Sequence, residues 1–266
     1  MPESLQKAKR SLRSRTQRFL TTDLYGRREV GAFCKEMSDV GDVAIFGGML
    51  RDLLLEGNER FRSDIDLVID TENLALLQKV LARYSPHRTN FGGYRIALQK
   101  WVVDLWPLQW TWAIRSGHVS GKSLADLTRT TFFNWDAIVY ELRSGAIHWT
   151  PHYVDELNNR ILSINLAVNP NPEGTAIRAL RMAFTKQARL SFVLAEYAAD
   201  VLEAVGVEAL FEKQQRKHGP VRISAEAMNH FLDSFRTAKA AGNTAPLELC
   251  ARQVELDLAF PEFGRS

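Results

Sequence analysis

Two neighbouring stretches, FGGMLRDLLLEG at residues 46–57 and SDIDLVID at residues 63–70, decide the fold. The first begins at the end of an apolar run, VAIF, which is typical of a short buried strand. A glycine pair follows, and the residues behind it predict a helix that closes at Gly57. The second stretch predicts another strand. A strand, a glycine turn, a helix and a strand therefore form the centre of an α/β domain.

Acidic residues stand where the second strand begins and inside a later strand. Asp64 and Asp66 flank an isoleucine, and because side chains alternate along a strand, both carboxylates project from one face. Asp104 lies within the apolar run WVVDLW, where a charge is costly unless it is paired or bound to a metal. Three such carboxylates are typical of two-metal phosphoryl-transfer sites, so we expect two Mg²⁺ ions there. The alternative for Asp104 is a salt bridge to Arg95 or Arg51.

The glycine pair predicts a phosphate-binding turn. Gly47 and Gly48 lack side chains, so the backbone can approach a phosphate, and the first N–H groups of the following helix point at it. Arg51 and Asp52 lie in the first turn of that helix. We expect Arg51 to contact phosphate or to organise the acidic strand, and Asp52 to favour the positive helix end.

Further elements extend the pattern on both sides. Residues 22–37 predict a helix with Thr22 or Asp23 as its N-cap, and residues 71–84 predict a second helix capped by Thr71. Two strands in succession and a hairpin-like pair complete a small mixed sheet. The pattern then changes to long helices, one of them running without a break over FVLAEYAADVLEAVGVEALFEKQ. We expect a basic helical segment, a head domain and a helical domain, at residues 1–40, 41–150 and 151–266.

Composition excludes several classes of protein. The chain has 266 residues with 45% hydrophobic and 24% charged residues, which excludes wholesale disorder. No apolar run is long enough for a membrane span, and the N-terminus lacks the apolar core of a secretory signal. The two cysteines, Cys34 and Cys250, exclude a disulfide scaffold and suit a reducing cytoplasm, so we expect a cytoplasmic protein without a membrane partner.

Basic residues gather near the N-terminus although the net charge is only +3. Six of them follow one another with no acidic residue between them: Lys7, Lys9, Arg10, Arg13, Arg15 and Arg18. Such a run is able to meet a phosphate backbone, and its alternative is a solvated helix face.

The combined string of residues 46–68 resembles the signature of the poly(A) polymerase and class II tRNA nucleotidyltransferase group of the DNA polymerase β-like superfamily. That signature is GGxxRDxLL followed at short distance by DxDxV. The resemblance implies a palm-like α/β head, Mg²⁺, an NTP such as ATP as substrate, and nucleotidyl transfer with release of pyrophosphate. The stretch after residue 158 resembles the family's helical neck.

Two family motifs are altered. The motif RRDFxxNAM, which in the tRNA enzymes contacts the sugar and triphosphate, aligns with TTFFNWDAI at residues 130–138, where the basic pair is absent and Asp136 replaces asparagine. The neck motif EDxxR, whose acid and arginine read the base, aligns with residues 174–178. Arg178 is kept, Arg181 follows one turn on, and both acids are gone. The resemblance places Asp136, Arg178 and Arg181 near the nucleotide.

The function expected is therefore Mg²⁺-dependent transfer of a nucleotide from an NTP to an RNA 3′ end, as in tRNA processing, without faithful addition of the C, C, A series. One alternative is transfer to a protein or small molecule, in a toxin-like or antibiotic-modifying role. Another is a degenerate head that binds nucleotide or RNA without catalysis.

Overall fold

The computed structural model describes residues 3–89, 92–216 and 223–249 and divides the chain into two compact units. The first unit runs to Asp155 and takes in Asn165–Val168, and the second contains Glu156–Ile164 and continues from Asn169. The helices of the first forty residues belong to the first unit. The functional assignment of residues 1–40, 41–150 and 151–266 stays a prediction.

The first unit is built on a seven-stranded mixed sheet with the strand order β3-β4-β5-β2-β1-β6-β7. The strands are β1 Asp42–Phe46, β2 Ile65–Asp70, β3 His87–Arg88, β4 Tyr94–Ala97, β5 Val102–Pro107, β6 Ile138–Glu141 and β7 Ile147–Trp149. β2 and β5 pair in parallel, and every other pair in this sheet is antiparallel. The mixed α/β sheet expected from the sequence is confirmed.

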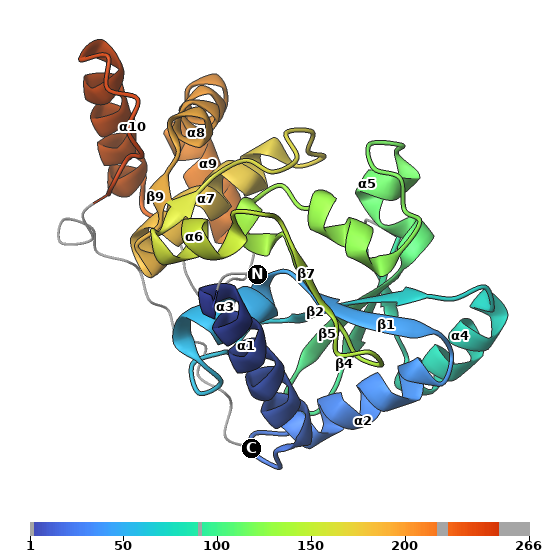
Figure 1. Cartoon of the computed structure of the whole chain (residues 1–266). Helices are drawn as coiled ribbons and strands as arrows, with labels where there is room; N and C mark the ends of the chain where they lie inside the picture. Colours follow the sequence, from blue (N-terminus) through green and yellow to red (C-terminus); the bar gives the residue numbers. More distant parts are fainter. Residues whose placement is uncertain (1–2, 90–91, 217–222, 250–266) are drawn as a thin grey trace. The chain divides into compact units, whose positions relative to one another are not determined.

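Helices cover both faces of this sheet. The α-helices are α1 Glu3–Thr21, α2 Arg27–Ser38, α3 Gly48–Glu56, α4 Leu74–Leu81 and α5 Trp112–Arg115, and α6 Tyr153–Asn158 crosses the boundary between the units. Short 3₁₀ helices are η1 Ala82–Tyr84, η2 Leu108–Trp110, η3 Leu124–Arg129 and η4 Asn134–Asp136. In Figure 1, α2 and α4 lie on the opposite side of the sheet from α5. Ala44, Val68 and Val139 pack under η2, α5 and η3 in one buried apolar cluster.

Two predicted helix starts are wrong. α2 begins at Arg27 behind Gly26, which takes a left-handed conformation with φ 73°, so neither Thr22 nor Asp23 is its N-cap. α4 begins at Leu74, and its N-cap is Asn73, whose side chain accepts the Leu76 N–H, and not Thr71. Asn and Thr are both good caps, so tertiary packing decides which one serves.

The second unit is helical apart from a short parallel pair of strands, β8 Ile161–Leu162 and β9 Arg189–Leu190. Its helices are α7 Pro172–Lys186, α8 Phe192–Val205, α9 Val207–Arg216 and α10 Ala225–Ala240. The single helix expected over residues 192–214 is wrong, because Gly206, with φ 89°, ends α8 and α9 begins after it. Rings of Phe192, Phe231 and Phe235 pack between α8 and α10.

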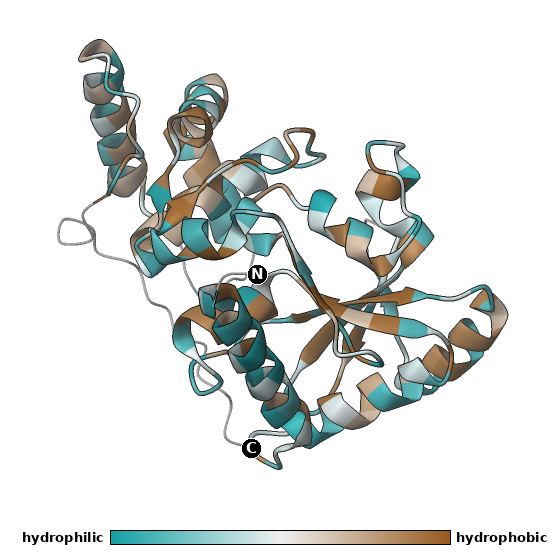
Figure 2. Cartoon of the chain, in the orientation of Figure 1, coloured by the Kyte–Doolittle hydropathy of each residue, from teal (hydrophilic) through white to brown (hydrophobic). Residues whose placement is uncertain are grey.

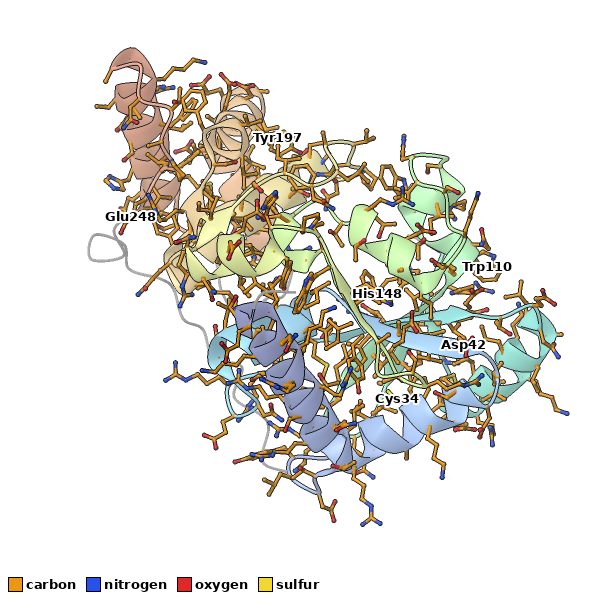
Figure 3. All side chains as sticks on the ribbon, in the orientation of Figure 1. Cys34, Asp42, Trp110, His148, Tyr197 and Glu248 are labelled. Atoms are coloured by element: carbon orange, nitrogen blue, oxygen red, sulfur yellow. The ribbon has the colours of Figure 1, made fainter. Side chains whose placement is uncertain are left out.

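Apolar residues are concentrated in the strands, whereas α1 shows mostly hydrophilic residues to the viewer (Figure 2). Among the described residues, none of the helices has both the length and the apolar character needed to cross a bilayer. Cys34, labelled in Figure 3, is buried on α2, and burial raises the pKa of its thiol to about 12. Cys250 lies outside the described residues.

Candidate active site

The three predicted carboxylates lie near one end of the sheet. Asp64 immediately precedes β2, Asp66 is the second residue of β2, and Asp104 is the third residue of β5. The parallel register places Asp66 directly beside Asp104. Residues at the same level of neighbouring strands point to the same face, so these two carboxylates share one face of the sheet.

Arg95 on β4 joins two of these carboxylates. It lies opposite Asp104 in the antiparallel register, and it donates to both Asp104 oxygens, from Nε at 2.8 Å and from Nη2 at 2.6 Å. Nη2 also donates to Asp64 at 2.8 Å. The Asp104 side chain is 10% exposed, whereas those of Arg95 and Asp64 are about half exposed. The salt bridge named as the alternative for Asp104 is present in the structure.

The electrostatics of this cluster are set by burial and by mutual charge. Burial is the largest influence on Asp64, the charge of Asp104 adds to it, and the two together outweigh Arg95, so the pKa of Asp64 is raised. The hydrogen bonds to Asp104 raise the pKa of Arg95 more than burial lowers it. The guanidinium is therefore held charged, and the site carries its own cation.

The donor chemistry of this cluster suits a hard divalent cation, because all three side chains offer carboxylate oxygens. The arrangement differs from a preformed metal site. Within the described part of the chain, no group of three or more His, Cys, Asp or Glu side chains is placed to hold a metal ion. Arg95 lies between Asp64 and Asp104, so a cation bound to both requires the guanidinium to move away.

The glycine turn lies at the same end of the sheet. Gly47 has φ 73° and ψ −131°, a conformation that favours glycine, and its N–H donates to the Ile138 carbonyl oxygen at 3.0 Å. The antiparallel register pairs Ile45 with Leu67, so the end of β1 comes level with the start of β2. α3 begins at Gly48, and the first N–H groups of a helix have no intrahelical partner. Phosphate and carboxylates can therefore meet at this end.

Arg51 lies in a buried ionic cluster behind the turn. Its Nε donates to Asp52 at 2.7 Å and its Nη1 donates to Asp136 at 2.5 Å, and all three residues are less than 8% exposed. Burial lowers the pKa of Arg51, and the charges of Asp136 and Asp52 more than offset that effect, so the pKa is raised. The structure thus joins the predicted residues Arg51, Asp52 and Asp136 to one another.

Tyr153 borders this cluster and was missed by the sequence reasoning. Its hydroxyl donates to the Trp135 carbonyl oxygen at 3.0 Å, and the ring is buried. Burial raises the pKa of Tyr153 most, the charges of Asp136 and Asp52 raise it further, and only the charge of Arg51 lowers it. Nothing in the local sequence marks this tyrosine, because it reaches the cluster only when α6 packs against η4.

Arg178 and Arg181 belong to α7 in the second unit. Arg178 is exposed, and Arg181 is largely buried with its Nε lacking a hydrogen-bond partner. Burial, followed by the charge of Arg178, lowers the pKa of Arg181. The Arg181 Nε, without a hydrogen-bond partner and beside the charge of Arg178, is suited to an anionic or acceptor-rich ligand.

The start of α7 is capped in a way that leaves no room for an acidic side chain at position 174. The Asn171 side chain accepts the Gly174 N–H at 3.2 Å and caps the helix. A Cβ at position 174 would lie 2.2 Å from the Asn171 amide nitrogen, so a glutamate there would displace the cap. Glu173, the remaining acid, forms an ion pair with Lys213 on α9.

No protein-family model matches the chain, and no curated protein matches it either. Solved structures do match. A CCA-adding enzyme with CTP aligns at 18% identity and a TM-score of 0.57 over 87% of this chain. A tRNA-processing enzyme in an apo form aligns at 20% identity and a TM-score of 0.52 over 89% of it. The Thermotoga maritima CCA-adding enzyme complexed with tRNA aligns at 18% identity and a TM-score of 0.51 over 80% of it.

These alignments show that the chain has the fold of the tRNA nucleotidyltransferases. The aligned part covers 55%, 57% and 50% of the three proteins, so this chain corresponds to little more than half of their length. The fold expected from the glycine and aspartate motifs is confirmed.

Proposed function

We propose that this chain is a nucleotidyltransferase that moves a nucleotide from an NTP to an RNA 3′ end and releases pyrophosphate. One observation carries the proposal: Asp66 and Asp104 lie side by side, at the end of the sheet where Gly47 and Gly48 begin α3. The shared fold supports the proposal, because the similar solved structures with CTP and with tRNA are those of CCA-adding enzymes. A cytoplasmic setting is part of the proposal, since NTP and RNA occur together there.

Each residue has a distinct task in the proposed reaction. The acceptor hydroxyl oxygen bonds to the α-phosphorus while the bond to the β-phosphate breaks, and pyrophosphate leaves with its electron pair. The backbone at Gly47 and Gly48 holds the triphosphate, and Asp104 helps to activate the acceptor hydroxyl. Asp64, Asp66 and Asp104 would hold Mg²⁺, which neutralises triphosphate charge and activates the hydroxyl when bound. Arg51, fixed by Asp52 and Asp136, keeps the turn in shape.

The test is incorporation of each labelled NTP into total RNA in the presence of Mg²⁺. We expect transfer by the unaltered protein and a loss of more than about a hundredfold in Asp66→Asn, the scale on which one transition-state-stabilising group acts. Asp70→Asn, on the same strand and the same face, is the matched control and should retain activity. Transfer by Asp66→Asn at the unaltered rate would refute the assignment of the site.

A second candidate is a protein that binds nucleotide or RNA without catalysis. It is favoured by Arg95, whose single positive charge Asp64 and Asp104 share in two ion pairs. The same assay separates the two functions. A catalyst incorporates label, whereas a binding protein retains labelled NTP or RNA in equilibrium dialysis and yields no product with any NTP.

A further inference from the structure

A cluster of cations surrounds the turn between α1 and α2, away from the carboxylates. Its members are Tyr25, Arg27, Arg62 and Lys100, and we call it the Tyr25 corner. The guanidinium carbons of Arg62 and Arg27 lie 5.1 and 5.9 Å from the centre of the Tyr25 ring. A Cβ on Gly26 would lie 3.4 Å from the Lys100 side chain, so the lysine stem borders the same turn. Two guanidinium groups thus lie around one aromatic ring, and a lysine stem borders the turn.

Arg27 is the unusual member, because it is buried against the Phe19 ring and has one side-chain N–H without an acceptor. The residue is 4% exposed, its Nη2 donates to the Asn58 carbonyl oxygen at 2.5 Å, and its buried Nε has no hydrogen-bond partner. Neither Arg27 nor Arg62 forms an ion pair with a carboxylate of the described residues. Burial and then the charge of Arg62 lower the pKa of Arg27, more than Tyr25 and the exposed Glu59 raise it. A buried charge in this state is costly unless an anion completes it.

The Tyr25 ring is exposed to solvent, and its backbone takes an unfavourable conformation. The residue is 60% exposed, and it takes a left-handed conformation with φ 55°, which is uncommon outside glycine and asparagine. The Trp101 indole N–H donates to the Tyr25 carbonyl oxygen at 2.8 Å and holds the turn in place. An aromatic ring held out to solvent among cations is typical of single-stranded nucleic-acid binding, where bases stack and phosphates are neutralised.

The corner lies at the end of the sheet that carries the carboxylates. Arg62 precedes Asp64 by two residues, and Lys100 precedes β5, four residues before Asp104. Four residues of chain span at most about 13 Å, which is the length of a few nucleotides of an extended single strand. A nucleic acid with its 3′ end at Asp104 can therefore reach the corner with its upstream phosphates.

We infer that the Tyr25 corner binds the acceptor strand of RNA upstream of its 3′ end. This inference rests on the proposed function for the identity of the ligand. Arg62 contacts a backbone phosphate, and the buried charge of Arg27 beside it adds to the attraction. Lys100 neutralises a neighbouring phosphate, and an unstacked base packs on the exposed part of Tyr25.

The test measures the affinity of the protein for a short fluorescein-labelled single-stranded RNA. Fluorescence anisotropy gives this affinity at each of a series of salt concentrations. Arg62→Gln should weaken binding about fivefold to tenfold and lower the slope of log affinity against log salt by about 0.7, the value for one phosphate contact on a single strand. Arg28→Gln is the matched control: Arg28 neighbours Arg27, is exposed and pairs with Asp23. An equal loss of RNA affinity in both variants would mean that the corner contributes only general surface charge, and it would overturn the inference.

Two further variants separate the corner from its alternatives. Tyr25→Asn suits the left-handed backbone, removes the ring and should weaken RNA binding with the salt slope unchanged. NTP affinity, measured by equilibrium dialysis, should be unaltered in Arg62→Gln, and a loss of NTP rather than RNA binding would assign the cations to the triphosphate instead. These readouts are affinities, so they test the corner separately from catalysis. If the corner variants weaken RNA binding but the protein shows no transferase activity, the proposed function is refuted and the inference stands. If the protein is an active transferase but the corner variants bind RNA as tightly as the unaltered chain, the inference is refuted and the proposed function stands.

Discussion

Arg95 holds Asp64 and Asp104 with one guanidinium, so a divalent cation has to compete with an arginine that belongs to the protein. We expect Arg95→Gln to bind Mg²⁺ about fivefold more tightly, because a half-exposed ion pair of this kind contributes up to about 1 kcal/mol. Titration calorimetry measures this affinity. Arg88→Gln, on the adjacent strand, is the control without carboxylate contact. Equal affinities in Arg95→Gln and the unaltered chain would show that the guanidinium does not compete.

Asp70, at the other end of β2, lies opposite Asp42, the residue labelled at the start of β1 in Figure 3. Burial, followed by the charges of Asp42 and Glu72, raises the pKa of Asp70. The folded chain therefore favours the protonated form, and stability falls as the pH rises above the usual Asp value of about 3.9. Asp70→Asn should raise the free energy of unfolding at neutral pH by about 0.5 kcal/mol. Urea unfolding should show this gain disappear in acid; a gain that persists in acid has another cause.

The sequence locates the individual site residues better than it locates their partners. Gly47, Asp64 and Asp66 follow from a turn signal and a two-residue period, which are local properties. The partner of Asp104 was left open between Arg95 and Arg51, because the choice depends on which strands are neighbours. The strand order sets β4 beside β5, and this pairing alone selects Arg95.

α3 is fixed to η4 by the buried cluster of Arg51, Asp52 and Asp136. Arg51→Met removes the cation that two buried carboxylates share, so we expect it to lower the free energy of unfolding by about 3–5 kcal/mol. Asp136→Asn keeps an acceptor oxygen for Nη1 and should cost clearly less. Urea unfolding followed by circular dichroism compares them. Equal losses would mean that the cluster acts through packing and not through charge.

α1 has basic residues of two kinds. Arg15 donates to the Leu53 and Leu54 carbonyl oxygens near the end of α3, at 2.5 and 3.0 Å, whereas Arg10 and Arg18 are exposed. We expect the double variant Arg10→Gln with Arg18→Gln to lower the salt slope of RNA binding by about 1.4, which corresponds to two single-strand phosphate contacts, and to leave stability unchanged.

Arg15→Gln is the counterpart of that double variant, and it should lower stability by about 1 kcal/mol with little change in the salt slope. Anisotropy and thermal melting measure the two effects. A double variant with the unaltered salt slope would assign the exposed face of α1 to solvent.

The sequence predicts which helices and strands exist more reliably than it predicts the residues at which they begin and end. The apolar runs of β1, β2 and β5 identify them as buried strands, since few other structures bury so short a run. The starts of α2 and α4 were placed wrongly because several residues near each start are able to cap, and packing selects among them.

At the scale of the whole molecule, we expect base choice to depend on α7 of the second unit, which carries Arg178. Arg178 offers only hydrogen-bond donors, and the Asn171 cap keeps acids out of position 174. An exocyclic amine left unpaired in a closed pocket costs about 1–3 kcal/mol. We therefore expect relaxed base choice and no ordered C, C, A series on a truncated tRNA. Sequencing of the extended 3′ ends tests this, and faithful C, C, A addition would contradict it.

The lengths of the connections between strands also decide when the carboxylate pair can form. β2 joins β5 across residues 71–101, whereas β1 joins β6 across residues 47–137. Closing the shorter connection costs less conformational entropy, so we expect the pairing of β2 with β5 to precede the pairing of β1 with β6. Asp66 and Asp104 lie on the two strands of the earlier pairing. A chain emerging from the ribosome therefore holds the two carboxylates side by side before β6 and β7 complete the sheet.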